Sequence, residues 1–522
     1  MRLQSSEAAL RNLKGIKTFP SSPRLIKDIS REGLISFEEA EAYFAKRAQL
    51  IDMKNANVVY DERLRPYQNA DVHFLKTFNK GKGVFNEQRM GKTPTTLVTM
   101  RAKNQNNSLI IVPFSVITHW MQEYERWHGG EIVTPKSHWT QEKRFKFYKN
   151  IKNNQSLILN YEKIVKDFEI LKTLYFDAII IDEAHRLRNY KGLEAKGTPP
   201  TVEKIIKLRR GIQDAYALTG TLAPNQPHNI CGILAFLYPD LFQYYWNVIE
   251  YYFENKQETN HMTGHAYPVI GGFKSIQKKE EMIGFLETFS TQRKRKDYMK
   301  WIPKVDHEEV YLELDEKEKR IHQELHQYNE YEHIECENHL ATMTTLRMLT
   351  GCPSRFNLPI RNVKLNWIKQ RIGDYPKRRL IIASMFTSIL KEYAKALAKH
   401  KPELLIGKLS KEKATKIKNK FQQGGIKVLL ANIEVIKEGI TLSKADELII
   451  VDPSLTYTDN EQLWDRILPT TPEEALKKDT LLITHLIIKE TIDVYINYAL
   501  KNKKRQVDIL NDYIKHKKEI IF

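Results

Sequence analysis

The sequence predicts an α/β protein with two lobes, each built on a parallel sheet. Short apolar runs such as SLIIVP, SLILN and FDAIIID alternate with polar helical stretches from about residue 57 to 240. The same rhythm returns from about residue 360 to 495 in RLIIASMF, KVLLANI and DELIIVD. Buried parallel strands have this appearance because crossover helices cover both faces of their sheet. With 522 residues, the chain also exceeds what one hydrophobic core usually supports.

The order of these patterns divides the chain into five expected segments. The alternation of apolar runs and polar helical stretches is absent before residue 57. It is lost again in the aromatic and charged stretch 241–345, and the C-terminal end is rich in lysine. No repeat of 20–50 residues and no low-complexity stretch is present, which excludes a solenoid. The expected segments are an N-terminal helical extension (1–56), a first lobe (57–240), a helical insertion (241–345), a second lobe (346–495) and a basic C-terminal helix (496–522).

Charge and composition narrow the class of partner. Lysine and arginine number 83 against 64 aspartates and glutamates, a net charge of +19 that favours a polyanion. Charge alone does not separate DNA, RNA and anionic lipid. There is no run of about 18 apolar residues and no apolar N-terminal stretch, so we expect neither a membrane protein nor a secreted one. The three cysteines are too few and too scattered for a disulfide framework.

One pair of histidines has the spacing of metal ligands. His322 and His326 lie four residues apart in a charged helical stretch, but no third ligand accompanies them and the pattern is not HExxH. A solvated helix face is the favoured interpretation.

The segment GVFNEQRMGKTPTTL predicts a phosphate-binding loop. Gly91, Lys92 and Thr93 lie between an apolar stretch and a helix start, where backbone N–H groups and the helix dipole hold phosphates. Lys92 would reach the β- and γ-phosphate oxygens and the Thr93 hydroxyl would bind Mg²⁺. Asn86 replaces the leading glycine of the usual pattern, and Arg89 occupies another position that is often glycine. Asparagine tolerates left-handed backbone, so the loop is still expected to form.

An apolar strand that ends in two carboxylates supports an ATPase site. In FDAIIIDEAH, Asp182 and Glu183 follow the strand directly. Ligands of parallel sheets bind beyond the carboxyl ends of the strands, so Asp182 is expected to hold Mg²⁺ and Glu183 to activate the attacking water. We interpret His185 as a link between the ATP and DNA states. The expected cofactors are therefore ATP and Mg²⁺.

Ordered segments from residue 64 to 493 resemble the Swi/Snf-type branch of helicase superfamily 2, whose ATPases have a DEAH-box motif and two RecA-like P-loop lobes. The resemblance covers about four-fifths of the chain and lies in LRPYQ, NEQRMGKT, SLIIVPFSVITHWMQEYERW, NYEKIVKD, ALTGTLAPNQPH, FSTQRKRKDYMK, LLANIEVIKEGITLSKADELIIVDP and DNEQLWDRILPTTP. It implies that Gln68 contacts adenine, and that Gln462 and Arg466 complete the nucleotide site from the second lobe. Arg466 would act as the arginine finger.

The same resemblance implies a set of nucleic-acid contacts. They are Trp120, Asn160, Tyr161, Arg293, Arg295 and Asn432. Each has a plainer alternative: the aromatic residues could be core side chains, and the basic run QRKRKDYMK could be a solvated face.

The main departure from the family pattern is Pro469, which stands where the family carries a second arginine. Proline offers neither charge nor donor, so either Arg466 serves alone or turnover is slow. Leu222 also replaces a customary proline.

The function implied by the resemblance is an ATP-dependent motor that tracks, branch-migrates or remodels duplex or branched DNA. Two alternatives stay open: a DNA-binding clamp or assembly factor with weak ATPase activity, and a strand-separating helicase. Replication or recombination proteins are expected partners. The expected location is cytoplasmic or nucleoid-associated, in a bacterial or viral host cell.

Overall fold

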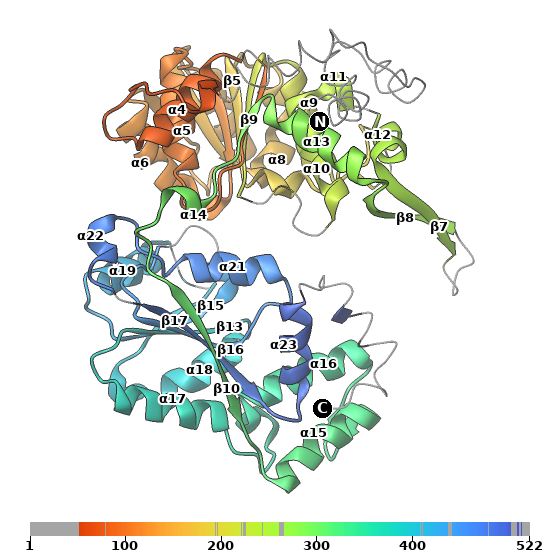
Figure 1. Cartoon of the computed structure of the whole chain (residues 1–522), viewed down its shortest axis with the longest axis vertical. Coiled ribbons are helices and arrows are strands. Elements are labelled where there is room, and N and C mark those ends of the chain that lie inside the picture. The colour runs from red at the N-terminus through yellow and green to blue at the C-terminus, as the bar shows by residue number, and fades with distance from the viewer. Residues whose placement is uncertain are drawn as a thin grey trace, which may run out of the picture. The chain divides into compact units, whose positions relative to one another are not determined.

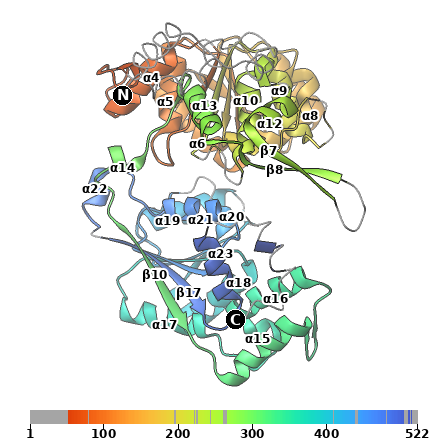
Figure 2. The same ribbon diagram turned by 45° about the vertical axis from the view of Figure 1, so that its right-hand side comes forward.

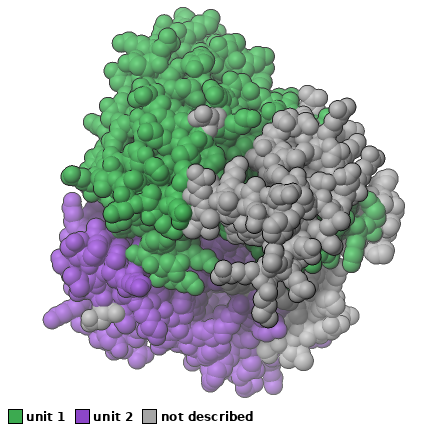
Figure 3. All heavy atoms as spheres, turned by 45° about the horizontal axis from the view of Figure 1, so that its top comes forward, with its two compact units in different colours: residues 1–298 green, residues 299–522 purple. Residues whose placement is uncertain are grey.

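Two α/β units make up the described part of the chain, which confirms the predicted fold class. The computed structural model describes residues 52–502, 509, 510 and 513, apart from residues 79, 194, 196, 221, 223–225, 243, 260–265, 408, 410, 437–440 and 479. Unit 1 ends at Tyr298 and unit 2 begins at Met299 (Figure 3). The expected N-terminal extension lies outside the described residues, except for its last few.

Seven of the described strands of unit 1 form a fully parallel sheet (Figure 1). Its central strands are buried along their whole length, as expected for apolar runs covered on both faces. The strands, in spatial order, are β3 (Glu131–Val133), β4 (Gln155–Asn160), β2 (Ser108–Val112), β5 (Ala178–Asp182), β6 (Asp214–Leu218), β1 (Gly81–Val84) and β9 (Ser290–Thr291).

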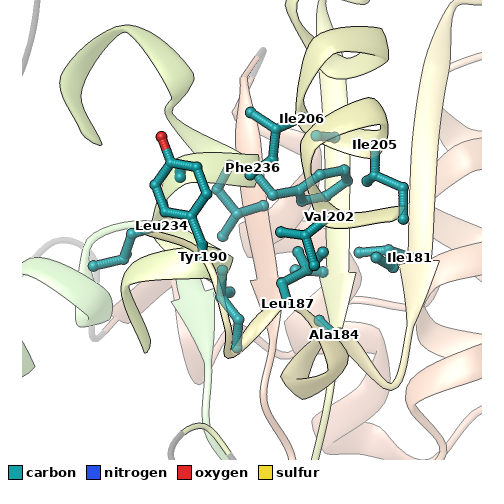
Figure 4. Packing of buried hydrophobic residues seen from close by; sticks show 14 of the residues in the cluster. Ile181, Ala184, Leu187, Tyr190, Val202, Ile205, Ile206, Leu234 and Phe236 are labelled. Carbon is teal, nitrogen blue, oxygen red and sulfur yellow. The ribbon is translucent and has the colours of Figure 1, made fainter. Parts of the chain in front are cut away.

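Helices cover both faces of this sheet and create two hydrophobic cores. Alternate residues of a strand enter opposite cores: Ile179 and Ile181 of β5 lie in one, and Ile180 lies in the other. Figure 4 shows Ile181 beside side chains of two covering helices, α9 and α10. The principal helices are α4 (Pro66–Lys76), α5 (Lys92–Ala102), α6 (Ile117–Trp127), α7 (Gln141–Lys149), α8 (Tyr161–Leu171), α9 (Pro200–Arg210), α10 (Ile230–Leu237), α12 (Tyr245–Tyr252) and α13 (Ile276–Glu287).

Unit 2 contains a second parallel sheet, with six strands among its described residues (Figure 2). The strands, in spatial order, are β10 (Val305–Leu312), β17 (Leu481–Ile488), β16 (Glu447–Asp452), β13 (Leu380–Ser384), β15 (Val428–Asn432) and β14 (Glu403–Leu405). The principal helices are α15 (Glu316–Tyr328), α16 (His339–Gly351), α17 (Val363–Asp374), α18 (Thr387–Ala396), α19 (Lys411–Gln422), α21 (Tyr457–Asp465) and α23 (Ile492–Lys501).

The stretch 241–345, expected as one helical insertion, is shared between the two units. Its first part adds the antiparallel hairpin β7 (Phe253–Thr259) and β8 (Ala266–Phe273) to unit 1, as well as the short edge strand β9. Its second part supplies β10, the first strand of the unit 2 sheet. These strands are difficult to recognise from sequence, because β9 has two residues and β10 carries charges along its length.

The histidine pair on α15 does not lie on a solvated face. His322 is fully buried, and His326 is buried with its Nδ1 3.0 Å from the Tyr513 hydroxyl. The described residues contain no cluster of three or more side chains suited to a metal ion. Within the same residues, no helix has both the length and the apolar character needed to cross a bilayer.

Candidate active site and nucleic-acid interface

Three neighbouring strands of unit 1 end at the same level of the sheet. In the parallel register, Asp182 of β5 lies opposite Leu218 of β6, and Leu218 lies opposite Val84 of β1. The phosphate loop, the acidic pair and the segment that begins at Thr219 therefore leave the sheet side by side. This edge is where α/β sheets bind their ligands.

The phosphate loop turns on two residues with left-handed backbone. Arg89 has a φ of +65° and Gly91 has a φ of +71°. Asn86, which we expected to tolerate such a conformation, does not adopt one. This φ would strain any side chain at Gly91, and the added Cβ would lie 2.1 Å from Nε2 of Gln68, so the Gln68 amide would have to move. The loop then delivers its backbone N–H groups to the first turn of α5, where Thr93 is half-buried.

Lys92 is held over the mouth of this loop. Its ammonium donates hydrogen bonds to the carbonyls of Asn86 at 3.1 Å and Glu87 at 3.3 Å. A Cβ on Gly220 would lie 3.5 Å from the same ammonium, which places the segment after β6 against the loop. Gln68 lies beside them, with its Nε2 3.3 Å from the Gly91 carbonyl.

Two aromatic side chains fix the acidic pair. The Trp120 indole donates to Oδ2 of Asp182 at 2.8 Å, and the Tyr161 hydroxyl donates to the carbonyls of Asp182 and Glu183. Burial and the neighbouring Glu183 carboxylate raise the pKa of Asp182, while Trp120 and the Lys92 charge oppose the rise. Glu183 itself has a φ of +54°, a strained conformation at the position expected to activate water.

His185 joins the acidic pair to the segment after β6. Its Nδ1 lies 3.2 Å from Oε2 of Glu183 and 3.2 Å from the Thr219 hydroxyl. This geometry gives Glu183 a physical connection to the adjacent segment, as the interpretation of His185 as a link requires.

A buried polar brace, made by Asp71, Asn86 and Arg293, supports the phosphate loop from behind. Arg293 pairs with Asp71 at 2.7 Å, and the Asn86 amide donates to the other Asp71 oxygen at 2.9 Å. The Arg293 backbone N–H donates in turn to the Asn86 side-chain oxygen at 2.9 Å. Asn86, which replaces a glycine of the usual pattern, therefore acts through its side-chain hydrogen bonds and not through its backbone conformation. Sequence reasoning missed this role of Asn86 and missed Asp71 altogether.

Several side chains expected at the nucleic-acid interface are buried inside unit 1. Trp120 is 1% exposed and Tyr161 is 5% exposed, which corresponds to the alternative of core packing. Arg293 is 8% exposed and ion-paired, so it is neither a solvated cation nor an available phosphate contact here. Asn160 is buried before α8 and donates to Glu162. Arg295 is half-buried, and its backbone N–H donates to Glu87 at 2.7 Å.

The residues expected to complete the nucleotide site from unit 2 lie on and just after α21. Gln462 is half-buried on this helix, and Arg466 follows its end, where the Arg466 carbonyl accepts a hydrogen bond from Leu442 N–H at 2.8 Å. The Arg466 charge lowers the pKa of Lys418, after the larger effect of burial. Pro469 is buried beyond them.

Asn432 lines a cavity of about 870 Å³ at the carboxyl ends of the unit 2 strands. Its amide donates to the carbonyls of Ser384 at 3.2 Å and Met385 at 2.8 Å, so this side chain shapes the wall. Arg355, Lys391 and Lys395, also in the lining, are exposed cations. The sequence analysis did not single out these three residues.

Comparison with protein families gives two matches. Residues 67–357 match the SNF2-related domain, which is more than half of the chain, and residues 363–468 match the helicase conserved C-terminal domain.

Comparison with individual proteins gives more distant relatives. An uncharacterized ATP-dependent helicase of Mycoplasma genitalium is 23% identical over 85% of this chain, which spans 42% of that protein. The ISW2 ATPase of the ISWI chromatin-remodeling complex of Saccharomyces cerevisiae is 30% identical over 36% of this chain and 17% of its own length. Among solved structures, the Sulfolobus solfataricus SWI2/SNF2 ATPase core in complex with dsDNA is 20% identical over 89% of this chain and 95% of that one, with a TM-score of 0.37.

Proposed function

The chain belongs to the SNF2-related family of helicase-like ATPases, and on that premise we propose that it is a DNA-dependent ATPase that translocates on duplex DNA. The observation that carries the proposal is the cluster at the ends of β1, β5 and β6. There the phosphate loop, the acidic pair and the His185–Thr219 contact meet in one unit.

The residues of this cluster fit Mg-ATP. The left-handed turn at Gly91 and the start of α5 suit phosphate oxygens, and an ammonium and a carboxylate lie beside them. When bound, ATP would supply the reactive phosphoanhydride and Mg²⁺ would offset its charge.

We assign the roles of the chain's own residues as follows. Lys92 neutralises phosphate oxygens, Thr93 and Asp182 hold the metal, and Glu183 takes a proton from the attacking water. Arg466 supplies charge from unit 2, and Gln68 and Gln462 complete the nucleotide contacts. His185 carries the state of Glu183 to Thr219.

Duplex DNA is proposed as the track for two reasons. The net charge of +19 suits a polyanion, and exposed cations line the cavity beside Asn432. Binding through phosphates predicts sequence-independent affinity that weakens steeply with salt.

Phosphate release measured with and without duplex DNA tests the proposal. Stimulation by duplex, together with displacement of a triplex-forming strand and no separation of a forked duplex, supports a translocase. Fork separation without triplex displacement would assign a strand-separating helicase. Binding to DNA with negligible turnover would assign a clamp or assembly factor, the alternative that Pro469 favours. Replication or recombination partners and a nucleoid-associated location remain predictions.

A further inference from the structure

Another cavity of unit 2 lies between α21, α23 and the sheet edge formed by β10 and β17. Its volume is about 310 Å³, which is within the size range of small-molecule sites. Neither Gln462 nor Arg466 lines it, so it is separate from the expected nucleotide contacts.

Aromatic rings form much of its wall. The Trp464 ring meets His307 edge-on at a centroid distance of 4.7 Å, and it meets Tyr457 and His485 edge-on at 5.8 and 6.1 Å. His307 and His485 are stacked at 5.5 Å. Flat walls of this kind suit a flat occupant that can stack or meet ring edges.

One hydrogen-bond donor in the cavity wall lacks an acceptor. The Trp464 indole N–H is buried and has no acceptor among the described residues. The two imidazoles are hydrogen-bonded to each other at 3.2 Å, and burial lowers the pKa of both, that of His485 to about 4. They are therefore uncharged at neutral pH. The Glu309 carboxylate is met by Lys501 at 2.8 Å and by Asn497 at 3.3 Å.

An occupant of this cavity should therefore be uncharged, planar and equipped with a hydrogen-bond acceptor. A charged molecule would find no opposite charge left unpaired, and an acceptor would satisfy the buried indole donor. We propose that the cavity binds an uncharged planar heteroaromatic molecule of nucleobase size through Trp464, His307 and His485.

The position of Trp464 connects this site to ATP turnover. Trp464 lies on α21 between Gln462 and Arg466, so an occupant that fixes its ring also fixes the helix end from which Arg466 extends. This consequence rests on the proposed function, whereas binding itself does not.

Titration calorimetry with two probes of the same shape tests the binding. 1-Methylbenzimidazole has a ring-nitrogen acceptor, which 1-methylindole lacks, and both are used at pH 8 with saturating ADP so that the nucleotide site is filled. We expect one site per chain and an affinity about fivefold higher for 1-methylbenzimidazole, the effect of one hydrogen bond to the buried donor. Equal affinity for the two probes would overturn the proposal.

Variants locate the site. Trp464→Phe keeps a ring but removes the donor, so the difference between the probes should disappear. Leu500→Trp fills the cavity and should abolish binding of both, whereas Tyr498→Trp places the same indole ring on the exposed face of α23 and should not. Binding that survives in Leu500→Trp would place the probes elsewhere. Thermal unfolding confirms that each variant folds.

The same chemistry could come from a free molecule or from a base on a nucleic-acid strand. Displacement of the probe by deoxyadenosine but not by a short oligodeoxyadenylate assigns a free molecule, and displacement by both assigns a base on a strand. Displacement by neither overturns the nucleobase-sized class.

Turnover is measured separately. A change in the ATPase rate of about twofold or more when the probe saturates the cavity supports the connection to Arg466, provided that Leu500→Trp shows no such change. Binding that leaves turnover unchanged overturns that connection alone. A protein that binds the probe but never hydrolyses ATP contradicts the proposed function and leaves the binding site standing.

Discussion

The two units hold their candidate catalytic groups in different ways. In unit 1, Asp182 and Glu183 stand at the end of β5, and Lys92 follows the loop after β1. Loop carbonyls hold Lys92, and Trp120 and Tyr161, from other parts of the chain, hold the acidic pair. In unit 2, Gln462 and Arg466 lie at one end of a single helix and are only half-buried. The candidate residues of unit 1 are therefore held by contacts within that unit, whereas the proposed effect of Arg466 depends on how the end of α21 is held.

Unit 2 also contains buried ion pairs, which lie in its core. Arg347 pairs with Asp452 at 2.9 Å, and Lys364 pairs with Asp493 at 2.7 Å, all in the core around the end of β16. The first pair joins α16 to the end of β16, and the second joins α17 to α23, so neither includes Arg466.

The largest effects are expected in the candidate site of unit 1. Lys92→Ala should abolish ATP binding, because the ammonium is the cation over the loop. Glu183→Gln should preserve binding and reduce turnover by about 10²–10⁴-fold, the usual contribution of a general base. Nucleotide binding and single-turnover hydrolysis, measured in parallel, separate the two effects.

The matched control is Glu169→Gln, which neutralises a carboxylate on the exposed face of α8. It should change neither measurement. Normal hydrolysis in the Glu183→Gln variant would remove the site assignment.

Loss of the Arg466 charge should reduce turnover nearly as much. Arg466→Ala should reduce DNA-stimulated turnover by about a thousandfold, as loss of an arginine finger does. Pro469→Arg should raise turnover if the local backbone tolerates the loss of proline's fixed φ. Single-turnover kinetics at saturating DNA measure both, with Arg320→Ala, an exposed arginine on α15, as control. A harmless Arg466→Ala would show that the finger lies elsewhere.

The sequence predicts the strands and the acidic pair because these signals are local. Continuous apolar runs locate the central strands, and DEAH at the end of one of them locates Asp182 and Glu183. The functional position of Lys92 follows from the register of β1, β5 and β6, which the order of the motifs already suggests.

The partners of these residues are not predictable in the same way, because they depend on tertiary contacts. Asp71 and Arg293 are 222 residues apart, and Trp120 and Asp182 are 62 apart. A run of positive charge such as QRKRK looks solvated until its partner is known. The β7–β8 hairpin and β10 were missed for a related reason, since neither has the apolar continuity of a central strand.

The buried brace gives a prediction about stability. Arg293→Met should reduce the free energy of unfolding of unit 1 by about 3–5 kcal/mol, because it leaves the Asp71 carboxylate buried without its cation. The double variant Asp71→Leu with Arg293→Met should lose less stability, because no buried charge is then left without its partner. Denaturant unfolding followed by circular dichroism measures both.

DNA binding distinguishes this role from a phosphate contact. Arg293→Met should leave the salt dependence of DNA affinity unchanged, whereas Arg355→Ala, in the cavity beside Asn432, should reduce the log–log slope by about one. The reverse result would show that Arg293 also contributes to DNA binding, in addition to its place in the brace.

The smallest expected effect concerns the buried histidine of unit 2. His322 is fully buried, and neither ring nitrogen has a hydrogen-bond partner among the described residues. Burial lowers its pKa to about 4, against opposing effects of Asp493 and Glu318, while Lys364 adds to the lowering. Because the unfolded chain binds the proton more tightly, the free energy of unfolding should fall as the pH drops from about 6.5 to 4, and should be unaffected by this group above that window. At pH 5 the loss should be about 2 kcal/mol. His322→Leu should remove it, so the variant should gain stability relative to the wild type as the pH falls from 8 to 5. His322→Gln removes the titration but keeps a buried polar group, and it should be less stable than wild type at pH 8 while showing the same flattened pH dependence as His322→Leu. Urea unfolding at several pH values provides the test, and parallel pH curves for wild type and His322→Leu would show that another group causes the acid sensitivity of unit 2.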